Sequence, residues 1–198
     1  MTIFCQTLKN ISMKNFICIF LLLTTILCVG YRKPYRYVID AERDAYYHNN
    51  VGLNYLRDRI YYAAIEEFKI AITLSPDTQA TAVFQSNLGE TYMYIGYPEM
   101  ARICFEDALE RYKLNFKYYL NLAECYEQLK IVQTKIKEYQ ASKSVYDKIM
   151  LGLLYIKTGE TRRGIVVLDD VCLSEPDILI TPAIKQYLKE QADKEIRE

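Results

Sequence analysis

The amino-acid sequence predicts an all-α fold in which pairs of antiparallel helices stack on one another. Two observations lead to this prediction. The chain of 198 residues contains 7 Gly and 5 Pro, which leaves room for long helices and little room for turn-rich β structure. A pattern of small and aromatic residues also recurs along the chain, at intervals typical of helical repeats.

The first half of the pattern is an apolar residue, a small residue and, three positions later, a tyrosine. An Asn precedes the apolar residue in three copies, whereas Met150 takes that place in the fourth. The small residues are Gly52, Gly89, Ala123 and Gly152, and the tyrosines are Tyr55, Tyr92, Tyr126 and Tyr155. Successive small residues are separated by 37, 34 and 29 residues, so the copies form units of similar length.

The second half of the pattern begins twelve residues after the first small residue. A second small residue stands there in three units, followed at fixed offsets by a large apolar residue: Ala64 and Phe68, Ala101 and Phe105, Gly164 and Leu168. Small residues let two helices approach closely, and large side chains fill the gaps between them. Since no single unit can cover its own apolar faces, the units are expected to stack.

This spacing resembles that of the tetratricopeptide repeat, a pair of antiparallel helices of about 34 residues. The resemblance divides residues 45–178 into four units, 45–78, 82–115, 116–144 and 145–178. The third unit is degenerate, because Lys135, Tyr139 and Ser142 replace its second-helix signature. It is also short, so its second helix or the following turn is expected to be curtailed. The resemblance implies a right-handed superhelical solenoid.

A capping helix is expected after the last unit. Thr181 precedes Pro182, and this pair is typical of a helix start with Thr as N-cap and Pro in the first turn. The predicted helix covers residues 182–198 and carries many charged residues, as expected of a solvated cap on the end of a stack.

Residues 1–30 predict a signal peptide or an N-terminal membrane anchor. The stretch from Phe16 to Val29 is apolar and uncharged, and Lys9 and Lys14 precede it. As a helix it would span about 21 Å, short of the roughly 30 Å hydrocarbon core, which favours a cleaved signal peptide over an anchor. Cys28 is a third alternative, as a lipidation site. Residues 31–44 are expected to form a tether and the start of the first helix.

The tetratricopeptide resemblance implies that the first helix of each pair lines a concave groove. The groove residues that it implies are Tyr46, Asn49, Leu53, Leu56, Arg57, Val83, Ser86, Glu90, Met93, Tyr94, Lys117, Leu120, Glu124, Glu127, Gln128, Tyr146, Ile149, Leu153, Ile156 and Lys157. Apolar and aromatic residues outnumber charged ones in this set, which suits an extended or helical peptide. Two alternatives remain: the groove binds a partner, or the last helix or a second copy of the chain covers its apolar residues.

Some members of the family clamp a C-terminal carboxylate with a set of basic residues and asparagines. In this chain Asn87 and Lys117 fall in matching places, but Asn49, Leu53 and Asn121 replace the others. Binding of that kind is therefore not expected. The repeated Asn50, Asn87 and Asn121 are instead expected to bond neighbouring helices.

Other classes of function find little support in the sequence. Lys and Arg number 25, as do Asp and Glu, and no run of five like charges marks a nucleic-acid binder. His48 is the sole histidine and CxxC is absent, so no metal site is expected. Glycine-rich phosphate loops and hydrolase motifs are missing. No cofactor, small-molecule substrate or catalysis is expected.

The sequence thus predicts a non-catalytic adaptor that binds a protein or peptide and is exported or membrane-anchored, with the membrane contacted only through the leader. The alternative is a self-associating structural subunit or an assembly factor of an envelope complex, of the pilus or outer-membrane type. That second role rests on fold-level analogy.

Overall fold

The computed structural model describes residues 44–195. The predictions for the leader (residues 1–30), for Cys28 and for residues 31–43 of the tether lie outside these residues. Within them the fold is all-α, with no strand. The helices are α3 (Ala45–Arg57), α4 (Tyr61–Leu74), α5 (Gln79–Tyr94), α6 (Pro98–Arg111), α7 (Phe116–Gln128), α8 (Val132–Gln140), α9 (Val145–Lys157), α10 (Thr161–Ser174) and α11 (Thr181–Glu195). The predicted fold class is confirmed.

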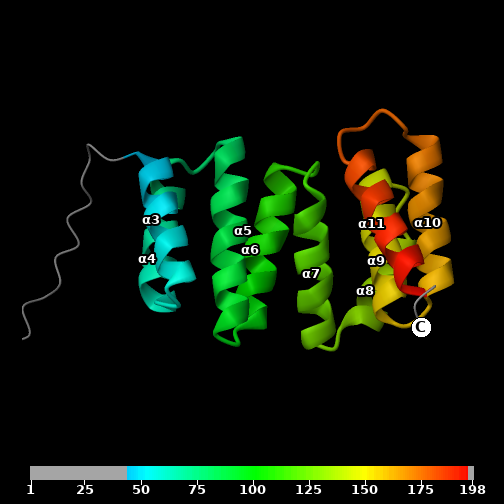
Figure 1. The fold of residues 1–198 in the computed structure, drawn as a ribbon, viewed down its shortest axis with the longest axis horizontal. Coiled ribbons are helices and arrows are strands. Elements are labelled where there is room, and N and C mark those ends of the chain that lie inside the picture. Colours follow the sequence, from blue (N-terminus) through cyan, green and yellow to red (C-terminus); the bar gives the residue numbers. More distant parts are fainter. Residues whose placement is uncertain (1–43, 196–198) are drawn as a thin grey trace, which may run out of the picture. The chain divides into compact units, whose positions relative to one another are not determined.

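The helices pack as successive antiparallel pairs, which Figure 1 shows as α3 with α4, α5 with α6 and α9 with α10. The second helix of each pair also packs against the first helix of the next, as α4 does on α5 and α6 on α7. Each unit thus covers the apolar face of its neighbour, as stacking of repeats requires.

The repeated small residues mark the closest approach within three of the pairs. A Cβ atom added to Gly52 would lie 2.7 Å from the Phe68 ring, and one added to Gly89 would lie 2.8 Å from the Phe105 ring. The same holds for Gly152, 2.7 Å from Cγ of Leu168. Real Cβ contacts are essentially never this short, so a larger residue at these positions would push the paired helices apart. The fixed spacing between the small and the large residue therefore marks where the two helices of a pair meet.

The turn inside each pair also repeats. Seven residues after the small residue, the backbone adopts a left-handed conformation, at Arg59 (φ 61°), Gly96 (φ 78°), Lys130 (φ 58°) and Gly159 (φ 83°). The following N–H reaches back to the tyrosine carbonyl of the pattern, as from Ile60 to Tyr55 over 2.8 Å. This is the geometry of a helix C-terminus that favours glycine. Two of the four turns, however, place a long basic residue there.

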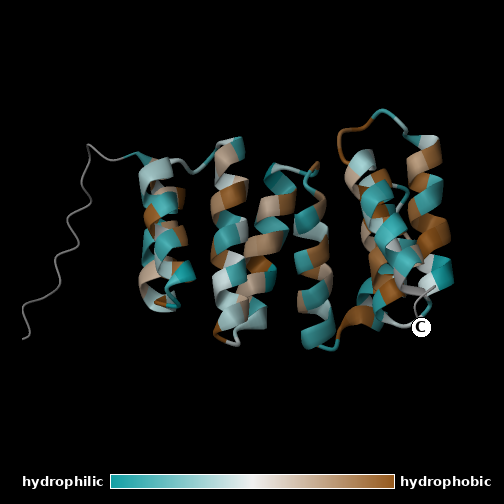
Figure 2. Ribbon diagram, in the orientation of Figure 1, coloured by the Kyte–Doolittle hydropathy of each residue, from teal (hydrophilic) through white to brown (hydrophobic). Residues whose placement is uncertain are grey.

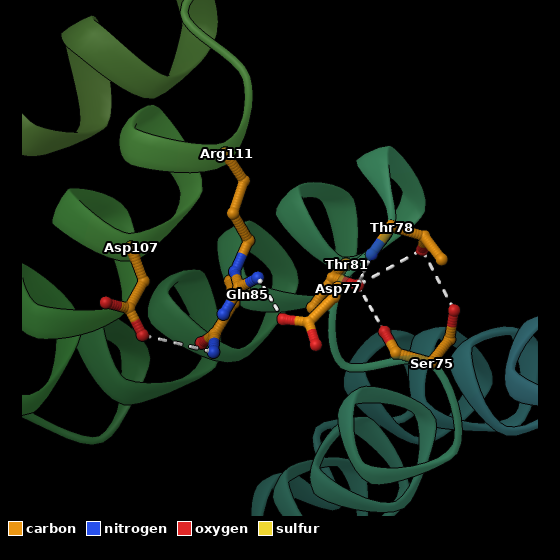
Figure 3. Close-up of polar contacts among 7 residues, drawn as sticks. All are labelled: Ser75, Asp77, Thr78, Thr81, Gln85, Asp107 and Arg111. Atoms are coloured by element: carbon orange, nitrogen blue, oxygen red, sulfur yellow. Dashed lines mark hydrogen bonds and ion pairs between the residues drawn. The ribbon is translucent and has the colours of Figure 1, made fainter.

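The loop between α4 and α5 is closed by hydroxyl groups. The Thr81 hydroxyl donates to the Ser75 carbonyl, while the Ser75 and Thr78 hydroxyls lie 2.9 Å apart (Figure 3). The loop before α11 repeats this arrangement, because the Thr181 hydroxyl donates to the Glu175 carbonyl over 2.8 Å. In both loops a proline follows the residue whose carbonyl accepts the bond. The sequence predicted Thr181 as the N-cap of the last helix. In the structure Thr181 is the first residue of α11, and its hydroxyl closes the loop before that helix.

The third pair differs from the others. Its second helix, α8, has 9 residues, and α9 packs directly on α7. Tyr139, which stands where Phe68 and Phe105 stand in their pairs, places its hydroxyl 3.2 Å from that of Tyr126. Tyr126 in turn donates to Glu106 of α6 over 3.1 Å. The departures from the repeat pattern thus form a polar contact of their own among α6, α7 and α8.

Helix α11 packs on α10 and closes the C-terminal end of the stack. Ile180 and Ile184 are fully buried and belong to the same cluster of core residues as Ile149 and Leu153 of α9. Figure 2 shows that most of α11 is hydrophilic, so a narrow stripe of the helix faces the core.

Candidate functional site

The predicted groove residues lie on the first helices of the four pairs, and we call their surface the groove face. Polar side chains tie neighbouring first helices together along it. Asn87 of α5 donates to Asn49 of α3 over 2.7 Å. Glu90 of α5 accepts from Asn121 of α7 over 3.1 Å and pairs with Lys117 of α7 at 2.6 Å. Asn87 and Asn121 thus bond neighbouring helices, while Asn50 is exposed.

The same contact type continues from α7 to α9. Lys157 of α9 pairs with Glu124 and, at 2.6 Å, with Glu127 of α7. The Lys157 ammonium group holds the pKa of Glu124 below its ordinary value, against the effect of burial. These contacts link all four first helices, so the groove face is held as one surface by bonds between adjacent helices.

In the N-terminal half, on α3 and α5, the groove face is open. Tyr46, Val83 and Tyr94 are exposed, Tyr94 by 65%. Met93 is half-buried, and Ser86 is buried. The Tyr46 ring meets Phe84 edge-on with 5.7 Å between ring centroids. Aromatic and aliphatic side chains are therefore available to a partner on this half.

A cleft of about 620 Å³ lies at one end of this open half. We call it the arginine cleft, and its lining is Leu53, Leu56, Arg57, Arg59, Tyr61 and Tyr94. The rings of Tyr61 and Tyr94 stack with 5.9 Å between centroids and 18° between planes. The cleft thus combines an aliphatic floor, an aromatic wall and two guanidinium groups.

On α9 the apolar residues of the groove face are buried or partly buried. Ile149 and Leu153 are buried, and Ile156 and Tyr146 are partly buried against the same core cluster. Leu153 and Leu53 each follow the glycine of their unit by one residue, yet Leu153 is 2% exposed and Leu53 lines the arginine cleft. Ile149 and Leu153 therefore line no open groove in this structure, because they share a core cluster with Ile184 of α11.

Helix α11 reaches past α9 to α7. The Tyr187 ring meets Phe116 of α7 with 5.4 Å between centroids. A second cleft of about 480 Å³ lies between these two helices, and Lys117 and Leu120 of the predicted groove face line it together with Gln186 and Glu190 of α11. The structure thus favours the alternative in which the last helix covers the fourth unit, and it extends that cover to the edge of the third.

Three cysteines and the histidine serve packing in the described chain. Cys104, Cys125 and Cys172 are buried free thiols, and burial raises the pKa of Cys104 and of Cys125 to about 12. Such thiols stay protonated and unreactive at neutral pH. His48 is buried between α3 and α4, where Nδ1 lies 2.7 Å from a carboxylate oxygen of Glu67.

A comparison with models of known protein families matches one of the helix pairs. Residues 84–113, which cover most of α5 and all of α6, match the model of the tetratricopeptide repeat. This chain contains a tetratricopeptide repeat. The other three helix pairs share the register of that repeat, since the small residue and the left-handed turn recur in each at the same separation.

Solved structures with similar folds are also tetratricopeptide repeat proteins. A crystal structure of MamA has 20% sequence identity, covers 77% of this chain and 92% of its own, and gives a TM-score of 0.47. PilF from Pseudomonas aeruginosa has 16% identity over 74% of this chain and 68% of its own, with a TM-score of 0.48. YrrB, a repeat protein with an unusual peptide-binding site, has 15% identity over 72% and 74%, with a TM-score of 0.44. No curated protein matches the sequence.

Sequence reasoning missed two residues of the arginine cleft. Arg59 lies in the turn and Tyr61 begins α4, so neither belongs to the first-helix positions that the repeat pattern assigns to the groove. A signal for Arg59 was present: it stands seven residues after Gly52, at the offset where Gly96 and Gly159 follow their own small residues.

Proposed function

We propose that this chain is a non-catalytic scaffold that binds a peptide or helix of another protein on the open groove face of α3 and α5. The repeat match and the stack of helix pairs support a protein-interaction scaffold. The observation that carries the finer proposal is the contrast between Leu53 and Leu153. The same residue in the same register is left available in one half and is buried in the other, in a cluster to which α11 contributes.

The covered half also indicates what the open half can hold. Ile184 of α11 belongs to the same core cluster as residues of α9, and Tyr187 of α11 meets Phe116 of α7, so first helices of this chain already contact an amphipathic helix. The open half offers the same kinds of side chain, with Tyr46 and Tyr94 as exposed aromatic anchors. Tyrosines of this kind often dominate the energy of protein interfaces, and burying each large apolar side chain contributes about 1.5–3 kcal/mol.

A second candidate is a self-associating structural subunit, or an assembly factor of an envelope complex of the pilus or outer-membrane type. It is favoured by apolar side chains exposed at the other end of the stack. Val166 and Leu173 of α10 and Leu179 of the following loop are exposed. A second copy of the chain could cover them, since exposed apolar patches often mark association surfaces.

A photo-crosslinking experiment separates the two candidates. Benzoyl-phenylalanine is placed at position 83 on the groove face in the full chain, in its native cells, and at position 166 of α10 as the matched control. We expect an adduct with one other protein from position 83 that position 166 does not give. An adduct of twice the chain's mass favours self-association, and equal labelling from both positions contradicts binding on the groove face.

We also propose that the chain is exported or membrane-anchored. The support is the apolar stretch from Phe16 to Val29, which lies outside the described residues. None of the described helices is long and apolar enough to cross a membrane. The mass and N-terminus of the chain from its native cells test this proposal. A chain that begins at Tyr31 indicates a cleaved signal, a lipid on Cys28 a lipoprotein, and a full-length chain in the membrane fraction an anchor. An uncleaved, unlipidated chain outside the membrane fraction contradicts export.

A further inference from the structure

We propose that the arginine cleft selects the partner, and that it takes an acidic peptide in which a carboxylate side chain lies beside an aromatic or aliphatic one. This inference rests on the proposed function and names the chemistry of the ligand. Three independent features of the cleft support it: its uncompensated charge, its aromatic wall and the backbone of Arg59.

The first feature is charge. Arg57 and Arg59 are exposed, and neither forms an ion pair with another residue of the described chain. The lining contains no carboxylate. Arg102, Arg111 and Arg163, in contrast, pair with Glu106, Asp77 and Glu160. Since guanidinium groups bind carboxylates through two parallel hydrogen bonds, two free ones on the rim of a cleft favour an anionic ligand.

The second feature is the surface between the charges. Leu53 and Leu56 form a half-buried floor, and the stacked rings of Tyr61 and Tyr94 form a wall whose outer ring is largely exposed. A ligand that bound only through charge would leave the leucine floor and the tyrosine wall exposed to water. An aromatic or aliphatic side chain next to the carboxylate covers it and contributes apolar burial. The cleft therefore suits alternating acidic and apolar residues of a peptide.

The third feature is the backbone of Arg59. Its φ of 61° is the left-handed conformation that Gly96 and Gly159 adopt in the equivalent turns. A non-glycine residue there is strained by its Cβ atom. Strain that is kept next to a cleft is often part of a binding site. Lys130 has the same strain in the third pair, with φ 58°, but it does not line the cleft.

This difference supplies a matched pair of variants. R59G removes a guanidinium group from the cleft and relieves the strain, whereas K130G relieves the same strain elsewhere. Both are expected to raise Tm by roughly 2–4 °C, because glycine fits the turn. Loss of binding in R59G can then not be attributed to loss of folding.

The probe is a library of short random peptides displayed on phage and selected on the full chain. We expect enrichment of Asp or Glu beside aromatic or aliphatic residues. The strongest peptide is then compared with its twin, in which Asn and Gln replace Asp and Glu, by fluorescence anisotropy. On the wild type and K130G the acidic peptide should bind roughly tenfold to a hundredfold more tightly than the twin. On R59G most of that preference should vanish.

The outcomes separate this inference from the proposed function. If peptides are selected and compete with crosslinking from position 83, but acidic residues are not enriched or R59G keeps the full preference, the groove face binds peptides and the arginine cleft does not select them. If no peptide competes and position 83 gives no adduct with another protein, the proposed function fails with it.

Discussion

The two halves of this helical stack start from the same pattern and end with different surfaces. On α3 and α5 the groove face exposes tyrosines and lines the arginine cleft, whereas on α9 its apolar residues are buried in a core cluster that includes residues of α11. The pairing of helices is alike in both, since Gly52 meets Phe68 much as Gly152 meets Leu168. The repeat therefore fixes how helices pair, and the segment after the last repeat decides which part of the groove face stays available.

The third pair helps to explain how one helix can contact two units. Because α8 has only 9 residues, α9 packs directly on α7, and the first helices of the third and fourth pairs lie close together. Helix α11 can then touch α10 and also place Tyr187 on Phe116 of α7. The shortened helix and the covered surface are thus parts of one arrangement.

Truncation of Ile184, the buried residue that fixes α11 in the core, should show the largest difference in stability between the two halves. Ile184 is fully buried, and Ile184→Ala is expected to lower the free energy of unfolding by about 2–5 kcal/mol, the usual range for a core isoleucine. Val83→Ala in the open half should change it by less than about 0.5 kcal/mol, because Val83 is 45% exposed. Urea denaturation of both variants measures the two changes in the free energy of unfolding. Equal effects would mean that α11 does not hold the C-terminal half.

A substitution that widens the close contact between α9 and α10 should have the next largest effect on stability. The position of Ala64 and Ala101 is taken by Gly164 in the last pair, and a Cβ added there would lie 2.5 Å from the Gly152 carbonyl oxygen. Gly164→Ala should therefore lower the free energy of unfolding by about 1–3 kcal/mol, as overpacking against backbone does.

Helix propensity alone predicts the opposite sign for this substitution, a gain of about 1 kcal/mol. Thermal or urea unfolding of Gly164→Ala thus separates the two explanations. A stabilised variant would show that the two helices can move apart at little cost. The reciprocal change, Ala64→Gly, should destabilise the first pair, because that pair already accommodates a methyl group.

The pairing of the helices could be predicted from the sequence because it depends on the sizes of residues at fixed positions. Gly52, Gly89 and Gly152, with their large partners, specify where helices meet, and the groove face follows from them. The cover by α11 could be stated only as one of two alternatives. Ile184 of α11 and Ile180 just before it show that this segment has an apolar face, but not which surface receives it. Arg59 was missed because its own residue type gives no sign of a left-handed backbone; the only signal is its offset, which it shares with Gly96 and Gly159.

The halves should also differ in how pH acts on the bonds between first helices. Helices α3 and α5 are tied by the neutral Asn49–Asn87 bond, whereas α7 and α9 are tied by Lys157 with Glu124 and Glu127. Lys157 lowers the pKa of Glu124, so this contribution is present above the ordinary value of 4.5 and is lost as pH falls through the lowered value. Burial acts to lower the pKa of Lys157, but its carboxylate partners outweigh burial and raise that pKa above its ordinary value of 10.5. The contribution is therefore present below pH 10.5 and is lost as pH rises through the raised value.

The comparison of Lys157→Met with Asn87→Ala tests this difference. The loss of unfolding free energy in Lys157→Met should be largest between these limits and should shrink on both sides. It should stay under about 1 kcal/mol, because the Lys157 and Glu124 side chains are 30% and 45% exposed. The loss in Asn87→Ala should be independent of pH over the same range. If Lys157→Met is as stable as the wild type at every pH, this side chain supports α9 only through its aliphatic stem, which Met keeps, and the charges between α7 and α9 add nothing to the fold.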